Sequence, residues 1–121
     1  MAKKALVVDD SASMRHMVTT TLVGAGYEVI QAVNGEEGLK QLSKTAIDII
    51  ITDLNMPVMD GITFTQQVRA TPSLKFTPVL LLTTESRADQ KARARAAGAT
   101  GWLTKPFDPL ALVATIKKIL P

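Results

Sequence analysis

The chain contains no cysteine and only one tryptophan, one tyrosine and one histidine among its 121 residues. The lack of cysteine excludes disulfide bonds, thiolate metal sites and cysteine nucleophiles, and it suits a reducing compartment. No apolar run approaches the ~20 residues of a membrane-spanning helix, and the N-terminal segment is too short for the apolar core of a signal peptide. We therefore expect a cytoplasmic protein that makes no contact with a membrane.

Charge is also limited, with 14 lysine and arginine residues against 11 aspartate and glutamate residues. The net charge of +3 is weak support for nucleic-acid binding, because no basic arm, zinc-finger spacing or helix-turn-helix pair accompanies it. We expect a solvated basic face and no nucleic-acid partner. Residues 1–121 suit a single domain, since no linker, repeat or low-complexity stretch divides them.

Short apolar runs alternate with helical patterns along the chain. The predicted strands cover residues 4–9, 27–32, 47–52, 78–83 and 100–104. A helical pattern follows each strand, which makes five βα units. Parallel neighbouring strands need a right-handed crossover helix, so this alternation predicts a parallel sheet covered on both faces. The sequence therefore predicts an α/β fold, a (βα)5 doubly wound three-layer sandwich.

Polar caps and glycines delimit the predicted helices. In chain order the helices begin at Ser11 or Ser13, Asn34, Gly61, Ser86 and Asp108. The apolar stripe of the first helix comprises Met14, Met17, Val18 and Leu22. Glycines end the first helix, at Gly24 and Gly26, and the fourth, at Gly98.

Three aspartates follow two of the predicted strands. Asp9 and Asp10 come at the end of the first strand, and Asp53 comes directly after the third. If these strands are parallel neighbours, the carboxylates meet at one edge of the sheet, where open α/β folds bind their ligands. Two carboxylates ~4 Å apart repel by roughly 4 kcal/mol at an effective dielectric near 20, so three together favour a bound cation. Mg²⁺ suits such a cluster, because it prefers oxygen ligands and commonly bridges carboxylates to a phosphate.

Four motifs in chain order resemble the receiver domains of two-component response regulators. They are Asp9-Asp10, the stretch 53–61 with its Asp53-Leu54-Asn55-Met56-Pro57 opening, Thr83-Thr84-Glu85 and Lys105-Pro106-Phe107. The resemblance covers essentially the whole chain and is strongest to the stand-alone chemotaxis type. It implies a flavodoxin-like fold with five parallel strands in the order 2-1-3-4-5, and a role in chemotaxis or motility.

The resemblance also assigns roles to the acidic motifs. It implies that Asp53 accepts a phosphoryl group from a histidine kinase and becomes an acyl phosphate. Asp10, Asp53 and the backbone carbonyl of Asn55 would be ligands of Mg²⁺ (Mn²⁺ is an alternative), with Asp9 holding bound water. Phosphoryl transfer asks the protein mainly for alignment and charge neutralisation, which suits a weakly nucleophilic carboxylate.

Lys105 and Thr83 end the fifth and fourth predicted strands, so both can reach the edge that carries the aspartates. We expect Lys105 to pair with a phosphoryl oxygen and the Thr83 hydroxyl to donate to one. The alternatives are a solvent-facing loop lysine and a strand-end threonine with a satisfied hydroxyl. The resemblance further implies a cis bond before Pro106.

The fourth predicted helix has only alanines as apolar residues, whereas the fifth has an apolar stripe. That stripe comprises Leu110, Leu112, Val113, Ile116, Ile119 and Leu120. Because apolar burial at ~25 cal/mol per Å² anchors a helix, we expect the fourth helix to shift when Thr83 is drawn toward a phosphoryl group. Trp102 matches the family's switch aromatic, and a packed core tryptophan is the alternative.

The implied output surface consists of the fourth helix, the fifth strand and the fifth helix. Its basic residues are Arg87, Lys91, Arg93, Arg95, Lys117 and Lys118. They favour an acidic segment of a downstream protein, a motor switch or another target, although a solvated helix face explains them as well. We expect the protein to act as a monomer.

The resemblance implies a phosphoacceptor with self-phosphorylation in the presence of Mg²⁺ and slow self-dephosphorylation, not an enzyme. Asn55 and Glu85 match positions that influence dephosphorylation in the family, and Thr84 lies beside the switch threonine. His16 falls outside the apolar stripe of the first helix, so we expect it to face solvent without a catalytic role.

Two other functions share this type of sheet. An aspartate-nucleophile phosphatase would need a second acid two residues after Asp53, where Asn55 stands. A phosphorelay intermediate, which passes its phosphoryl group to another histidine, is equally compatible with the motifs. The phosphorelay therefore remains the main alternative to a chemotaxis role.

Overall fold

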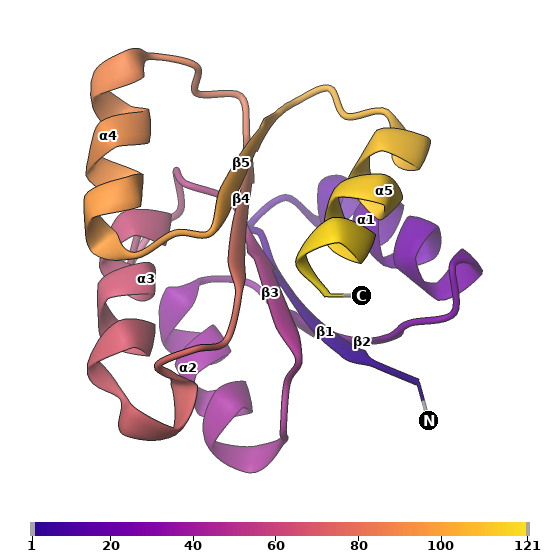
Figure 1. Cartoon of the computed structure of the whole chain (residues 1–121), viewed down its shortest axis with the longest axis horizontal. Coiled ribbons are helices and arrows are strands. Elements are labelled where there is room, and N and C mark those ends of the chain that lie inside the picture. Colours follow the sequence, from indigo (N-terminus) through magenta and orange to yellow (C-terminus); the bar gives the residue numbers. More distant parts are fainter. Residues whose placement is uncertain (1, 121) are drawn as a thin grey trace.

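The computed structural model describes residues 2–120 and contains one parallel sheet (Figure 1). Its strands are β1 (Lys4–Val8), β2 (Glu28–Ala32), β3 (Ile49–Thr52), β4 (Val79–Thr83) and β5 (Gly101–Thr104). The strands pair in parallel in the order β2-β1-β3-β4-β5. The α/β fold predicted from the alternating pattern and the strand order implied by the family resemblance are both confirmed.

Five α-helices cover the two faces of the sheet. They are α1 (Ala12–Gly24), α2 (Gly35–Lys44), α3 (Gly61–Ala70), α4 (Ala88–Ala97) and α5 (Pro109–Ile119), with a short 3-10 helix at Pro72–Leu74. Helices α1 and α5 lie on one face, and α2, α3 and α4 lie on the other (Figure 1). No helix among residues 2–120 is long and apolar enough to cross a membrane.

The core is divided by the sheet because successive strand residues point to opposite faces. In β1, Ala5 and Val7 belong to the cluster beneath α1 and α5, while Leu6 and Val8 belong to the cluster beneath α2 and α3. All four side chains are buried. A strand buried on both faces reads as a continuous apolar run, which explains why β1, β3 and β4 were recognisable in the sequence.

Three of the predicted polar caps are present in the structure, whereas Ser86 does not cap α4. The Ser11 hydroxyl accepts from the backbone N–H of Met14 at 3.3 Å, so Ser11 and not Ser13 caps α1. Asn34 caps α2, and Asp108 caps α5. Gly98 ends α4 with a φ of 106°, a left-handed conformation that glycine adopts without strain.

Several predicted boundaries differ from the structure by one or two residues. Each strand is shorter than predicted, and β3 begins at Ile49, not at residue 47. The Asp48 carboxylate accepts from the backbone N–H of Lys4 at 2.8 Å. The N–H of Lys4 at the start of β1 is therefore bonded to a side chain and not to a backbone carbonyl of a longer β3. Helix α4 begins at Ala88, two residues after Ser86, because the Glu85 side chain binds the backbone N–H of Arg87 and keeps that segment extended.

Two residues of the predicted apolar stripes are exposed. Met17 is 53% exposed, because the buried stripe of α1 passes through Val18 and Leu22 on the adjoining face. Leu110 is 81% exposed, since it lies in the first turn of α5, before the helix crosses the sheet at Leu112. The prediction that these two side chains contribute to the core is wrong.

Candidate functional site

Three carboxylates meet at the C-terminal edge of the sheet. Strand β1 delivers Asp9 and Asp10, and its neighbour β3 delivers Asp53. One carboxylate oxygen from each lies within 4.8 Å of the others. Asp9 is buried, Asp53 is partly buried and Asp10 is exposed, so the cluster opens to solvent on the side of Asp10.

Lys105 supplies a positive charge within this cluster. Its ammonium nitrogen Nζ lies 2.9 Å from Asp9 Oδ2 and 3.5 Å from Asp53 Oδ2. The lysine side chain is only 8% exposed, so it is not a solvent-facing loop lysine. The peptide bond between Lys105 and Pro106 is cis, as the family resemblance implied.

Hydrogen bonds to the backbone hold the two inner carboxylates in place. The backbone N–H of Ser11 donates to Asp9 Oδ1 at 2.9 Å, and that of Leu54 donates to Asp53 Oδ1 at 2.7 Å. The Arg15 guanidinium donates to the backbone carbonyl of Asp9 at 2.7 Å. Asp53 Oδ1 is therefore held by its neighbouring amide, and Asp53 Oδ2 is the oxygen that faces Lys105.

Gly61 allows α3 to begin directly beside Asp53. Its N–H donates to the carbonyl of Leu54 at 2.8 Å, and a Cβ at this position would collide with the backbone oxygen of Asp53. A residue other than glycine would thus push the helix away from the loop that carries Asp53. The sequence indicated only that Gly61 opens a helix, because this close approach depends on how α3 packs.

The oxygen-rich cluster fits a hard divalent cation. Its three carboxylates carry more negative charge than the single ammonium of Lys105 balances. Magnesium binds through one or two carboxylates and keeps several waters, which suits a cluster that is open at Asp10. Asn55 follows Asp53 by two residues and is exposed in the loop after β3.

Thr83 ends β4 beside this cluster and is fully buried. Its backbone carbonyl accepts from the N–H of Lys105 at 2.8 Å, and its hydroxyl accepts from the N–H of Glu85 at 3.3 Å. The latter bond uses a lone pair of the hydroxyl and not its hydrogen, so the group keeps a hydrogen to donate. Thr84 is exposed, while Glu85 is partly buried and forms an ion pair with Arg87 at 3.0 Å.

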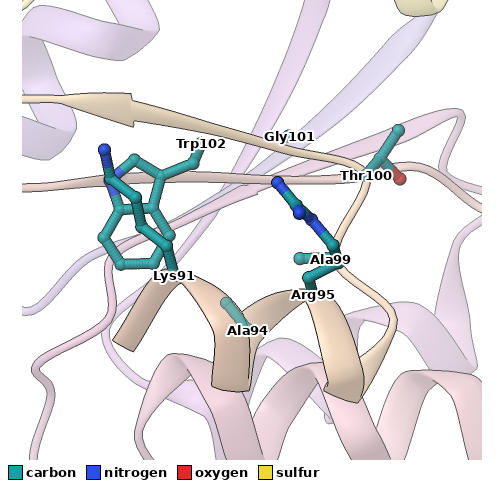
Figure 2. Close-up of a pocket in the computed structure, with 7 residues that line it drawn as sticks. All are labelled: Lys91, Ala94, Arg95, Ala99, Thr100, Gly101 and Trp102. Carbon is teal, nitrogen blue, oxygen red and sulfur yellow. The ribbon is translucent and has the colours of Figure 1, made fainter. Parts of the chain in front are cut away.

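Trp102 lies on β5 and lines a surface pocket (Figure 2). Its ring packs against the apolar cluster that contains Leu81 and Ala94, and Lys91 Nζ lies 5.9 Å from the ring centroid. The buried indole nitrogen has no hydrogen-bond partner among residues 2–120. The pocket is lined by Lys91, Ala94, Arg95, Ala99, Thr100, Gly101 and Trp102.

The remaining candidate residues lie outside the acidic cluster. The six basic residues of the predicted output surface are all exposed: Arg87, Lys91, Arg93, Arg95, Lys117 and Lys118. His16 is exposed on α1, as expected. Arg15, which contacts the backbone of Asp9, was not predicted from the sequence. An arginine at this position of a helix could equally face solvent, so the sequence alone does not indicate the contact.

Comparisons with known proteins agree with this architecture. The model of the "Response regulator receiver domain" family matches residues 5–117. Chemotaxis protein CheY1 of Helicobacter pylori is 38% identical over 97% of this chain and 96% of its own length. The structure of chemotaxis protein CheY4 of Vibrio cholerae is 49% identical with a TM-score of 0.96, covering 99% of this chain and 100% of that one.

Another similar structure comes from a histidine kinase and not from a CheY protein. The signal receiver domain of a signal transduction histidine kinase from Syntrophus aciditrophicus is 34% identical to this chain. It superimposes with a TM-score of 0.91 and covers 98% of this chain and 90% of that one. The same fold therefore serves both in CheY proteins and within a histidine kinase.

Proposed function

This chain belongs to the family of response regulator receiver domains, and from that premise we propose that it is a phospho-accepting switch with Asp53 as the acceptor. CheY-like receivers are in general signal transducers and not enzymes, and the CheY relatives are consistent with a role in chemotaxis signalling. The observation that carries the proposal is the position of Asp53 Oδ2, which lies 3.5 Å from Lys105 Nζ inside a cluster of three carboxylates.

In the proposed reaction, Asp53 Oδ2 forms a bond to the phosphorus atom of a phosphohistidine on the kinase. The bond between that phosphorus and the histidine nitrogen breaks, and the histidine keeps the electron pair. The backbone N–H of Leu54 orients the carboxylate through Oδ1. The Lys105 ammonium, already beside Oδ2, neutralises charge on the phosphoryl oxygens.

We assign Mg²⁺ to the same cluster, where Asp10, Asp53 and the Asn55 carbonyl would hold it and Asp9 would hold its water. When bound, the cation supplies further charge neutralisation for the phosphoryl group. Mn²⁺ is an alternative, because it also favours carboxylate and carbonyl oxygens. Asp9 is already bonded to Lys105 and to the Ser11 amide, which supports an indirect role for its carboxylate.

Readout would begin at Thr83, whose hydroxyl is expected to donate to a phosphoryl oxygen. Thr83 is linked through Glu85 to Arg87 at the start of α4, so movement at Thr83 reaches that helix through three residues. Trp102 on β5 packs beside α4 and is the proposed switch aromatic. The exposed basic residues around them support an acidic segment of a downstream protein as the target.

We also propose that the protein slowly removes the phosphoryl group itself. Asn55 follows Asp53 by two residues and Glu85 follows Thr83 by two, and both have polar groups that can orient a water molecule. Thr84 is exposed next to the switch threonine and belongs to the same loop. We further propose that residues 1–121 form one receiver domain that acts in the cytoplasm as a monomer.

A phosphorelay is the second candidate function. The similarity to the receiver domain of a histidine kinase supports it, since such a receiver sits in a protein that itself handles phosphoryl groups. In a relay, Asp53 would pass its phosphoryl group to a second histidine. The acceptor chemistry at Asp53 would be the same.

The test is the intact mass of the protein after incubation with acetyl phosphate and Mg²⁺. We expect a gain of one phosphoryl group in the wild type, none in Asp53→Asn, and none when the metal is chelated. Asp89→Asn, which changes an exposed aspartate on α4, is the matched control and should be phosphorylated like the wild type. Phosphorylation of Asp53→Asn, or none in the wild type, would refute the proposal.

A further inference from the structure

Helix α4 is held differently at its two ends. None of its first six residues, 88–93, is buried, and its N-cap residue Arg87 makes no side-chain capping bond to the helix. Ala94 is the first buried residue, at 1% exposure, and Ala97 packs partly against the same apolar cluster. The C-terminal half of the helix thus carries its buried contacts with the rest of the molecule.

A partly buried arginine from α3, Arg69, adds polar contacts at this C-terminal end. Arg69 Nε donates to the carbonyl of Gly98, the C-cap of α4, at 3.0 Å. Its Nη1 donates to the carbonyls of Leu74 and Thr77 at 3.2 and 2.7 Å, in the segment that leads into β4. One guanidinium therefore joins α3, the end of α4 and the approach to β4, three segments on the same side of the sheet (Figure 1).

The fit between Arg69 and Gly98 is close. A Cβ on Gly98 would lie 2.7 Å from Arg69 Cγ, so the arginine stem occupies the space that a side chain would need. Burial lowers the pKa of the Arg69 guanidinium from its ordinary value. It donates to three backbone carbonyls, and a C-terminal carbonyl of a helix is a favourable partner for a cation.

The N-terminal end of α4 is connected instead to the acidic site. The Glu85 N–H donates to the Thr83 hydroxyl, and the Glu85 carboxylate accepts from both the backbone and the side chain of Arg87. These contacts are local in the chain, spanning only residues 83–87. They would follow Thr83 if that residue moved, whereas the Arg69 contacts would not.

We propose that Arg69 is a positioning residue that fixes the C-terminal end of α4, so that a change at the acidic site moves this helix at its N-terminal end. The fixed end is a property of the unmodified protein. The movement rests on the proposed function, since it requires a phosphoryl group at Asp53. The hydrogen bonds of Arg69 run to carbonyls outside the acidic cluster, so its effect on the output surface is transmitted through α4.

The test is amide hydrogen exchange, resolved along α4, with three variants of the full chain. Arg69→Met keeps the aliphatic stem and removes every donor, while Arg69→Lys keeps the charge but not the planar fork that reaches several carbonyls. Lys40→Gln, an exposed cation on α2, is the matched control for the lost charge. Each protein is measured alone and with Mg²⁺ and beryllofluoride as the phosphoryl analogue.

In the unliganded protein, Arg69→Met should raise exchange of residues 94–100 by about tenfold, since hydrogen bonds to a charged group are lost. Arg69→Lys should give an intermediate rise, and Lys40→Gln none. Within residues 84–100, beryllofluoride should change exchange of residues 84–91 alone in the wild type, and of residues 94–100 as well in Arg69→Met. These results would establish both the fixed end and its consequence.

Two results would overturn the inference. The first is unchanged exchange at residues 94–100 in Arg69→Met. The second is a rise of equal size in β1 and α1 in both arginine variants, which would make Arg69 a general contributor to stability. If the wild type does not respond to beryllofluoride while Arg69→Met still loosens residues 94–100, the proposed phospho-switch fails and the fixed end stands.

Discussion

Helices α4 and α5 flank the edge strand β5 from opposite faces, yet different forces hold them (Figure 1). In α5, Leu112 and Ile116 are fully buried in the cluster that also contains β1 and β4 side chains. In α4, Ala94 is the only buried side chain, and one hydrogen bond, from Arg69 Nε to the Gly98 carbonyl, holds the C-terminal end. A helix with large buried apolar side chains resists displacement. A helix with one buried methyl group and a polar contact at one end can shift more easily.

This difference indicates how one domain can combine a rigid scaffold with a mobile output surface. The acidic cluster is built on the ends of β1 and β3, which are buried on both faces. The readout is assigned to α4, where little apolar area has to be exposed when the helix moves. Burying small residues is thus a way to keep the free-energy cost of a conformational change low.

The largest effect should come from removing a buried side chain of α5. Ile116→Ala should lower the free energy of unfolding by about 2–5 kcal/mol, because it removes buried methylene groups and leaves a cavity. Urea unfolding followed by circular dichroism measures this loss. Leu110→Ala in the same helix is the control, and as an exposed residue it should change stability by less than ~0.5 kcal/mol. A loss below ~1 kcal/mol for Ile116→Ala would contradict the anchoring assigned to α5.

A smaller effect is expected in α4. Ala94→Gly should lower the free energy of unfolding by roughly 1–2 kcal/mol, the sum of a helix-propensity term and one buried methyl group. Ala92→Gly, at an exposed position of the same helix, carries the propensity term alone. The same unfolding measurement on both variants isolates the buried contact. If Ala94→Gly costs as much as Ile116→Ala, the contrast between the helices is wrong.

Much of the fold follows from the sequence because the apolar runs are strong and the caps are specific. Asn34 and Asp108 cap helices where predicted. The failures are at positions decided by packing. Met17 and Leu110 are apolar and correctly spaced, but their exposure depends on the angle at which a helix crosses the sheet. No pattern of apolar residues encodes that angle.

The residues in and around the candidate site were also only partly predictable from the sequence. Asp9, Asp53 and Lys105 were predictable because parallel strands bring their C-terminal ends to one edge. Arg69 was not, since a single arginine in the last turn of a helix also suits solvent. Its three carbonyl partners come from segments that meet only after α3, α4 and β4 are in place. Long-range contacts of polar side chains around the site are therefore the part of the structure that the sequence left undetermined.

The central claim is that the acidic cluster controls the surface formed by α4 and β5. Trp102 is the only tryptophan in the chain and packs at the junction of these two elements, so its fluorescence reports on that surface. The decisive measurement is a titration of tryptophan fluorescence with beryllofluoride in the presence of Mg²⁺, in the wild type and in Asp53→Asn. We predict a saturable change in the emission of the wild type and none in Asp53→Asn. An unchanged wild-type emission, or an equal change in both proteins, would contradict the coupling between the two regions.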